Sequence, residues 1–404
     1  MVKDQHAFEE PPVFVETNRL LFGNGLLSAL GDHHRKQRKM LNPVFSIAHI
    51  RNMVPIFHDV INKLRDTIAR KVSSGEAEID ILAWSSRIAL ELIGQGGLGY
   101  SFDPLTDEEH AHPYTEALKE LLPLSSRTLW ARVWILPLVQ VFPPRFLRLL
   151  ALYTPIRNIQ RGRVLSDYMW SVSTEIYQSK LRALEVGDCA VLEQVGRGKD
   201  VISVLINENM KASDVDKLDE AEIIGQASDL PPVRTPAFHS YRLTRAYRTL
   251  IFAAMDTTSN ALARTLQLLS ENPDVQAKLR EEVRAARGAQ GGKDLPYDEL
   301  VSLPYLDAIC RETLRLYAPV ARVLRETNKD TLLPLSTPIR CEDGSILSEI
   351  PLPANTSIYV SILNSNRNVD LWGPDALEWK PERWLSPLPP AVAEAKIPGV
   401  YSHL

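Results

Sequence analysis

Residues 249–270 read TLIFAAMDTTSNALARTLQLLS, and this stretch decides the fold class of the chain. It is apolar almost all the way round, which is typical of a helix buried inside a mainly helical protein. Its centre nevertheless carries Asp256, Thr257 and Thr258. A carboxylate is costly to bury unless it is paired, and adjacent β-branched residues weaken a helix locally. We therefore expect a buried central helix whose polar middle turn has a specific use.

Two interpretations of that turn stay open on these residues alone. In the structural one, the threonine hydroxyls donate back to carbonyl oxygens one turn earlier, and Asp256 pairs with a basic side chain. In the functional one, Asp256 and Thr257 form an acid–alcohol pair that relays protons into a dry cavity. The motif by itself favours the structural interpretation.

The composition is that of an ordinary globular protein. The 404 residues are 45% hydrophobic and 24% charged with a net charge of -4, so no nucleic-acid-binding surface is indicated. Three cysteines, Cys189, Cys310 and Cys341, form no CxxC pair. This spacing argues against a zinc site or a disulfide framework and favours a reducing compartment.

One apolar stretch raises the question of a membrane. Residues 1–12 are polar and do not resemble a signal peptide. Residues 133–144 are uncharged, but about a dozen residues fall short of the roughly 20 that cross a bilayer. The apolar pattern continues to Tyr153 with Arg145 and Arg148 interleaved. Such a segment is typical of a membrane interface, and a buried core helix is the equally weighted alternative.

The hydrophobic periodicity predicts a single mainly α domain with a small β region (α+β). Residues 1–318 are expected to be mostly helical, and residues 319–404 to form a β-hairpin and irregular turns. The expected helices cover residues 51–72, 80–98, 153–185, 273–287 and 304–317. The expected strands are a hairpin at 339–350 around Asp343-Gly344 and a strand at 355–362.

Two further expectations concern helix 273–287. Asn272 is expected to be its N-cap and Pro273 its first residue. Glu281 and Glu282 are expected to lie on its solvated face, among basic neighbours.

Residues 227–248 (ASDLPPVRTPAFHSYRLTRAYR) interrupt the pattern. Three prolines within six residues forbid a continuous helix, and no strand period is visible. The stretch is therefore expected to be an insertion, either a long surface loop or residues foreign to the fold. One hypothesis is that it is a translated intron.

Two charged motifs are weak when taken singly. Glu312 and Arg315 lie three residues apart on the expected helix 304–317, which usually means a surface ion pair; apolar neighbours favour burial here, with Arg383 as a second partner. Residues 31–39 (GDHHRKQRK) most often form a solvated face. Their alternative role is to grip an anion through His34 and Arg38, four residues apart on one helical face.

Together these motifs resemble one family. Residues 253–258 (AAMDTT) are similar to the distal-helix motif A/G-G-x-D/E-T-T of cytochromes P450, Glu312-x-x-Arg315 to the ExxR of its K helix, and residues 381–384 (PERW) to its PERF segment. They occur in the family's order and spacing. The chain thus resembles a fungal microsomal cytochrome P450, a haem-thiolate monooxygenase, over nearly its whole length. The resemblance implies that fold in incomplete form, truncated at both ends.

The resemblance also implies roles for individual residues around haem b. Asp256 and Thr257 would be catalytic, with Thr257 protonating bound dioxygen and Asp256 admitting protons. Cofactor contacts would come from Ala253 and Ala254 at the distal face and from His34, Arg38 and Arg325 at the propionates. Glu312, Arg315 and Arg383 would form a structural triad.

Three departures from the family pattern matter. Ala254 stands where the family usually has glycine. The signature F-x-x-G-x-R-x-C-x-G is absent, so the chain supplies no metal ligand, and none of its three cysteines is placed to replace the missing one. The membrane anchor and first strands of a microsomal member are expected before residue 1. Without thiolate ligation the family's chemistry is not expected.

The implied function is a monooxygenase that inserts one oxygen atom from dioxygen into a hydrophobic small molecule, as in fungal secondary metabolism. Electrons would come from NADPH through NADPH–cytochrome P450 reductase. The full-length protein would lie on the cytosolic face of the endoplasmic reticulum membrane, and this chain, without the anchor, would be either soluble or in peripheral membrane contact. The alternatives are an inert truncated family member and a helical membrane-surface or lipid-binding protein.

Overall fold

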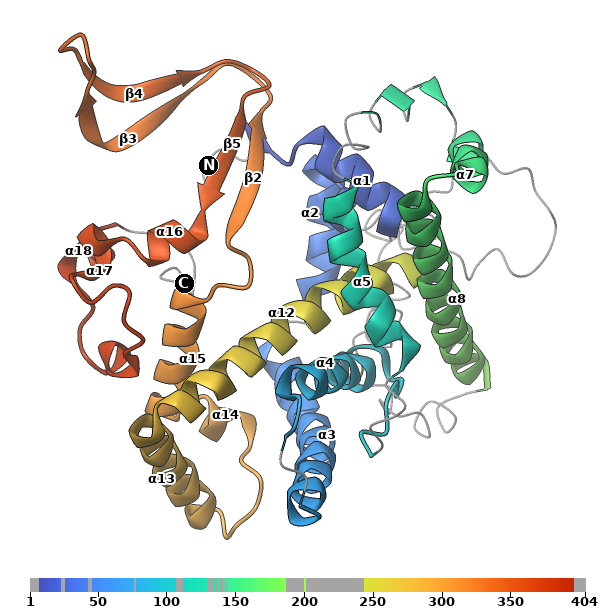
Figure 1. Ribbon diagram of the computed structural model, residues 1–404, viewed down its shortest axis with the longest axis vertical. Coiled ribbons are helices and arrows are strands. Elements are labelled where there is room, and N and C mark those ends of the chain that lie inside the picture. Colours follow the sequence, from blue (N-terminus) through green and yellow to red (C-terminus); the bar gives the residue numbers. More distant parts are fainter. Residues whose placement is uncertain are drawn as a thin grey trace.

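The structure is a computed structural model that describes residues 7–22, 26–42, 46–75, 78–106, 112–128, 134, 137–138, 141–142, 144–186, 200 and 243–395. Helices make up most of the chain before residue 317, and the longer strands follow (Figure 1). The fold class is thus mainly α with a small β region, as the sequence predicted.

The elements before residue 187 are helical apart from one short strand. Their bounds are β1 Phe8–Glu9, α1 Pro12–Phe22, the 3-10 turn η1 Leu26–Ser28, α2 Gly31–Leu41, α3 Ile47–Ser73, α4 Ile81–Leu92, the π-helical turn η3 Ile93–Leu98, α5 Pro113–Arg127, α7 Pro144–Tyr153 and α8 Arg157–Val186.

The elements after residue 242 begin with long helices and end in short ones. Their bounds are α12 Leu243–Glu271, α13 Pro273–Ala289, α14 Tyr297–Leu300, α15 Pro304–Leu316, β2 Arg322–Thr327, β3 Thr331–Arg340, β4 Ile346–Leu352, β5 Ser357–Ser361, α16 Ile362–Asn366, α17 Val369–Trp372, the 3-10 turn η5 Pro381–Leu385 and α18 Pro390–Glu394.

Helix α12 crosses the middle of the molecule and packs against α4 and α8 (Figure 1). Ile251 and Met255 are fully buried in the largest core cluster, which also includes residues of α4, α5 and α8. The helix is buried on this side only, because Ala253 and Thr258 are exposed. The expectation of a helix buried all round was therefore wrong. The apolar residues that are exposed on this helix include Ala253 and Leu266.

Helix α12 begins at Leu243, six residues before the predicted start at 249. The end of the stretch 227–248 is thus helical, contrary to expectation, because no proline follows Pro236 and the residues LTRAYR tolerate a helix. Residues 227–242 lie outside the described part of the chain. Their interpretation as an insertion stays a prediction.

The first two predicted helices are confirmed as α3 and α4. Helix α3 begins four residues before the predicted start because the Ser46 hydroxyl caps it, accepting a hydrogen bond from the His49 amide at 3.3 Å. Asp80 caps α4 through the Ala83 amide at 2.9 Å. The glycines that follow α4 do more than end it. A Cβ added at Gly96 would lie 2.8 Å from the Phe57 ring, so the close packing of α3 requires a residue without a side chain.

Helix α13 begins at Pro273 with Asn272 at the N-cap position, as predicted, but the Asn272 side chain makes no capping hydrogen bond. The Asn272 side-chain amide donates instead to the Leu268 carbonyl at 2.8 Å, one turn earlier. Glu282 is not merely solvated either. Its carboxylate accepts hydrogen bonds from the amides of Tyr305 (2.8 Å) and Leu306 (2.9 Å), and so caps the first turn of α15.

The strands form two small antiparallel sheets. One has the order β1-β2-β5, with Phe8 opposite Thr327 and Arg325 opposite Ile358. The other is the predicted hairpin of β3 and β4. Its turn contains Gly344 at φ +85, and the Asp343 carboxylate accepts from the Ser345 amide at 2.9 Å. After β5 the chain forms short helices rather than strands.

Helix α7 carries the amphipathic half of the stretch singled out in the sequence, whereas most of residues 133–143 lie outside the described part. Its apolar side chains point outward: Phe146, Leu149, Leu150, Leu152 and Tyr153 are exposed. The alternative of a buried core helix was therefore wrong for α7. No helix among the described residues is both long and apolar enough to span a bilayer.

Candidate functional site

The polar turn of α12 is held by bonds within the helix. The Thr257 hydroxyl donates to the Ala253 carbonyl at 2.7 Å. The Asp256 carbonyl accepts from the Ser259 hydroxyl (3.1 Å) and the Asn260 amide (2.8 Å). This back-bonding is the geometry of the structural interpretation for Thr257.

The Asp256 carboxylate does not follow that interpretation. It is half-buried, and no side chain among the described residues forms a hydrogen bond or ion pair with it. The expected basic partner is thus missing within that part of the chain.

Small side chains surround this turn. Ala253 is exposed and Ala254 half-buried, whereas the next residue, Met255, is fully buried. Ala253 and Thr257 are four residues apart and hence share one face of α12. This low face of α12 therefore carries only small side chains, with the Thr257 hydroxyl at one end. A flat ligand could approach it closely.

Glu312, Arg315 and Arg383 meet in the core beside α15. The Arg315 guanidinium donates to both Glu312 carboxylate oxygens at 2.8 and 2.7 Å, and Arg383 Nε lies 3.4 Å from Glu312 Oε1. The side chains of Glu312 and Arg315 are 0% exposed and that of Arg383 is 7% exposed. The structure thus brings this sequence-predicted group together.

Further bonds satisfy the buried charges. Arg315 donates to the carbonyls of Asn366 (2.6 Å) and Ala376 (2.7 Å), and Trp384 Nε1 donates to Glu312 at 3.0 Å. A buried ion pair is stabilising only when its remaining donors and acceptors are satisfied in this way. The group therefore fastens α15 to the chain between α16 and η5.

Asp375 is a partner of this group that sequence reasoning missed. Its carboxylate accepts from Arg383 Nη1 at 2.9 Å, and this bond is the main cause of a pKa below the ordinary carboxyl value; Lys380 adds to it. Asp375 lies eight residues from Arg383, in a turn without periodicity, so no sequence pattern reveals it.

The basic run lies on α2, where Arg38 is exposed and His34 half-buried. Neither side chain has a hydrogen bond or ion pair with the residues that the structure describes. The neighbouring His33 does form a hydrogen bond, because its Nε2 lies 2.9 Å from Gln37 Nε2. Arg38 is thus available to an anionic ligand.

Arg325 lies in β2 and is partly engaged. Its guanidinium donates to the Leu324 carbonyl at 2.8 Å and lies 3.2 Å from Glu10 in an ion pair. Glu10 follows β1, whose pairing with β2 brings it there, and sequence reasoning missed it. Among the described residues, no hydrogen bond or ion pair joins His34, Arg38 or Arg325 to α12.

The haem that the resemblance implies fits some of these residues better than others. The low face of α12 suits one side of a flat porphyrin, and Arg38 suits a carboxylate. A cysteine ligand for the iron is harder to assign. Cys310 lies on α15, Cys341 follows β3, and Cys189 lies outside the described ranges. No cluster of metal-binding side chains occurs among residues 7–395 where they are described. Among the described residues, the exposed face of α12 and Arg38 thus suit parts of a haem site, and neither described cysteine lies on α12 or α2.

Comparisons with known proteins agree with this picture. The family model described as Cytochrome P450 matches residues 1–390. Cytochrome P450 monooxygenase 91 of Postia placenta is 50% identical over the whole chain, which spans 70% of that protein. Ganoderic acid synthetase CYP5150L8 of Ganoderma lucidum is 44% identical, again over the whole chain and 71% of that protein.

The fold agrees as well. The crystal structure of a cytochrome P450 (CYP102L1) superposes with a TM-score of 0.64 at 21% identity, covering 94% of this chain and 72% of the other. That structural similarity shows the fold, and the family model and the fungal relatives show the family membership. The chain belongs to the cytochrome P450 family of monooxygenases, which are haem-dependent oxidoreductases.

Proposed function

We propose that this chain contributes the distal face of the haem site in an enzyme that inserts one oxygen atom from dioxygen into a hydrophobic small molecule. The observation that supports the proposal most is the low face of α12, where exposed Ala253 precedes the Thr257 hydroxyl by one turn and Asp256 lacks a described partner. NADPH would supply the electrons through NADPH–cytochrome P450 reductase.

Haem b, when held by a cysteine thiolate, supplies the activation of dioxygen. The residues of this chain would bind and orient it. Arg38 and Arg325 would each grip one propionate, because a guanidinium stays charged and binds a carboxylate at two points. His34 would add a contact on the side of Arg38. The triad of Glu312, Arg315 and Arg383 would keep α15 in place without touching the ligand.

The Arg325–Glu10 ion pair does not prevent this binding. Its side chains are 31% and 36% exposed, and a pair of that kind contributes at most about 1 kcal/mol. A propionate in two-point contact therefore competes successfully for the guanidinium.

Proton handling would fall to Thr257 and Asp256. At rest the hydroxyl hydrogen of Thr257 points to the Ala253 carbonyl, so the hydroxyl oxygen is left as an acceptor. To deliver a proton the hydroxyl turns away from that carbonyl. Asp256, half-buried and adjacent, then supplies the next proton from the solvent side.

Peripheral contact with the cytosolic face of the endoplasmic reticulum membrane is part of the proposal. It is supported by the exposed apolar side chains of α7, a helix whose sequence also contains Arg145 and Arg148. A role in fungal secondary metabolism is supported by the name of the Ganoderma lucidum relative, ganoderic acid synthetase.

A second candidate, an inert family member, is favoured by one observation. The described cysteines, Cys310 and Cys341, lie on α15 and after β3, and neither belongs to the family's signature. A chimera separates the two candidates: the signature loop and C-terminal part of the Postia placenta relative are fused after Leu404. With reductase and NADPH, we expect it to oxygenate members of a panel of apolar compounds. A chimera that binds haem but oxygenates none would contradict the proposal.

A further inference from the structure

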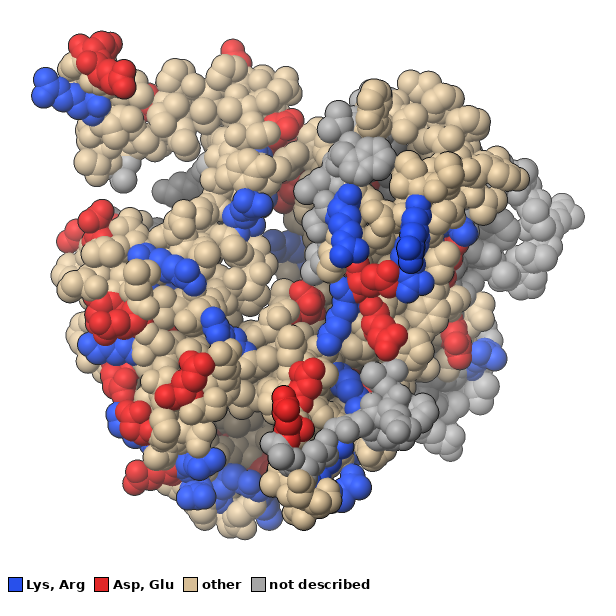
Figure 2. Space-filling model, in the orientation of Figure 1, with Lys and Arg blue, Asp and Glu red and all other residues tan. Residues whose placement is uncertain are grey.

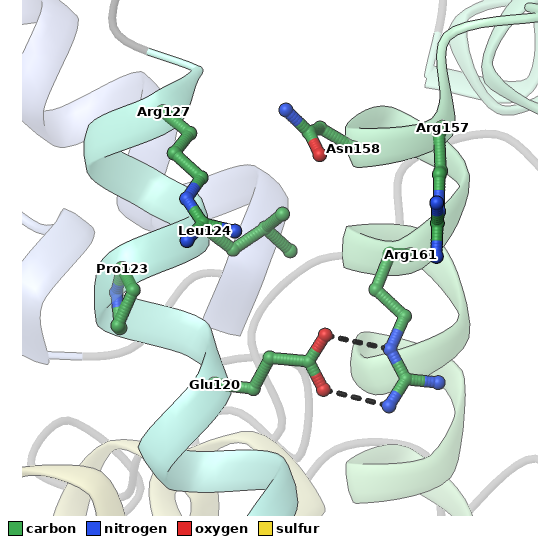
Figure 3. A pocket seen from close by; sticks show the side chains of 7 residues that line it. All are labelled: Glu120, Pro123, Leu124, Arg127, Arg157, Asn158 and Arg161. Atoms are coloured by element: carbon green, nitrogen blue, oxygen red, sulfur yellow. Dashed lines mark hydrogen bonds and ion pairs between the residues drawn. The ribbon is translucent and has the colours of Figure 1, made fainter.

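A cavity of about 340 Å³ lies between α5 and α8 (Figure 3). Its lining is Glu120, Pro123, Leu124, Arg127, Arg157, Asn158 and Arg161. The helices approach closely at its floor, because a Cβ added at Gly162 would lie 3.4 Å from Leu124 Cδ2. It shares no residue with the face of α12 described above.

The charge of the lining is strongly unbalanced. Three arginines face one carboxylate, which leaves a formal charge of two positive units (three minus one). Glu120 is already used: Arg161 donates to its two oxygens at 2.7 and 2.6 Å, and these bonds lower the Glu120 pKa. Figure 3 shows Arg127 and Arg157 on either side of the space above that pair. Neither forms a hydrogen bond or ion pair with any described residue, so both guanidiniums are available.

The cavity also contains the start of α8. The Ile156 carbonyl accepts from the amides of Ile159 (3.0 Å) and Gln160 (3.1 Å), so the amides of Arg157 and Asn158 precede the helical bonds. The Asn158 side chain lines the same space. Amide donors at a helix start favour an anion, and here they add to two available guanidiniums.

An apolar face is fixed beside this cavity. Only residues 154–156 separate α7 from α8. The Gln160 amide bridges them, donating to the carbonyls of Ala151 (2.7 Å), Leu152 (2.8 Å) and Thr154 (2.8 Å). The end of α7 is therefore fastened to the first turn of α8, the turn that carries Arg157 and Asn158. Figure 2 shows basic side chains, with acidic side chains between them, over α5 and α8 on the face that it presents.

We propose that the cavity between α5 and α8 binds a phosphate group, provided by the headgroup of an anionic phospholipid whose chains meet the apolar face of α7. Phosphate offers several acceptor oxygens and up to two negative charges, which match two guanidiniums with a net charge of two. The phosphate site itself is independent of the proposed oxygenation. The lipid source rests on the membrane contact proposed for α7.

Titration of the chain with inorganic phosphate and with glycerol 3-phosphate, followed by calorimetry, tests the site itself. Arg127→Gln and Arg157→Gln should each weaken binding roughly tenfold through the loss of a charge-assisted hydrogen bond. Arg182→Gln is the matched control, because Arg182 lies on α8 about 37 Å along the helix and, among the described residues, hydrogen-bonds only to the Gln178 carbonyl. Glu120→Gln should tighten binding, because it removes the competing carboxylate and frees Arg161.

Arg127→Gln is expected to weaken phosphate binding and Glu120→Gln to strengthen it. Opposite changes in affinity cannot both result from a general loss of folding. Equal phosphate affinity in the Arg127, Arg157 and Arg182 variants would overturn the site. So would weaker binding in Glu120→Gln.

Sedimentation with phosphatidylcholine vesicles, with and without phosphatidic acid, tests the lipid source. Binding should require the acidic lipid and fall roughly fivefold for each arginine removed. Leu149→Gln should reduce vesicle binding and leave the affinity for glycerol 3-phosphate unchanged. If phosphate binds but both kinds of vesicle bind equally or not at all, the lipid source is overturned, and this result leaves the proposed oxygenation untouched.

Discussion

Glu312 and Arg315 lie three residues apart on α15 and share two hydrogen bonds, of 2.8 and 2.7 Å, with both side chains completely buried. Six further donors and acceptors complete the group, from Asn366, Ala376, Glu378, Lys380, Arg383 and Trp384. Segments far apart in the sequence therefore depend on one carboxylate. The first prediction follows from that dependence.

Glu312→Gln should lower the free energy of unfolding by about 3–5 kcal/mol, because it leaves the Arg315 guanidinium buried without its counter-charge. Urea denaturation measures the effect. Asp32→Asn is the control, since the Asp32–Arg35 pair is 90% and 69% exposed and contributes at most about 1 kcal/mol. A similar loss of unfolding free energy in the two variants would contradict the prediction that the buried group is the more stabilising one.

Asp375 should make stability fall in acid. Its pKa is lowered in the folded state by Arg383 and is near 3.8 when no such partner is present. The stabilisation is therefore present above about pH 3.8 and is lost as the pH falls toward the folded pKa. Asp375→Asn should flatten the dependence of unfolding free energy on pH in this range. An unchanged acid slope in the variant would contradict the pairing.

Glu282 should matter more than its neighbour Glu281. Glu282→Ala removes the acceptor for the amides of Tyr305 and Leu306 and should cost about 1 kcal/mol, a typical value for a helix cap. Glu281 is exposed, so Glu281→Ala should change the unfolding free energy by less than about 0.5 kcal/mol. Thermal denaturation of both variants measures these changes in unfolding free energy. Equal changes in the two variants would contradict the capping role of Glu282.

Thr257→Ala should separate proton delivery from folding. The hydroxyl only satisfies the Ala253 carbonyl within the helix, so stability should change little. In the haem-loaded chimera, oxygen uptake should continue while product formation falls roughly tenfold or more. Thr257→Ser, which keeps the hydroxyl, should retain most of the product. Full product formation by Thr257→Ala would exclude the proposed role.

The sequence predicted the elements with a strong local signal. The periodicity of α3 and α4, the Pro273 start of α13 and the Asp343-Gly344 turn each depend on nearby residues, and each is confirmed. The ExxR spacing also placed Glu312 and Arg315 on one helical face, which the structure shows.

What the sequence missed depends on partners that tertiary packing brings together. Glu282 caps a helix that begins more than twenty residues later, and Glu10 reaches Arg325 only because β1 pairs with β2. The amphipathic character of α12 was hidden because apolar residues, Ala253 and Leu266 among them, also lie on its exposed face. The cavity between α5 and α8 has no sequence signature at all, since its arginines come from two helices thirty residues apart.

The central claim is that α12 faces a haem whose propionates Arg38 and Arg325 hold. The most direct measurement is the carbon monoxide difference spectrum of the reduced chimera, recorded during haem titration. The account predicts a thiolate-type Soret band in the unaltered chimera and a haem affinity that falls roughly tenfold or more when Arg38→Gln and Arg325→Gln are combined, with no change in Arg182→Gln. The same affinity in all three proteins, or no thiolate-type band at any haem concentration, would contradict it.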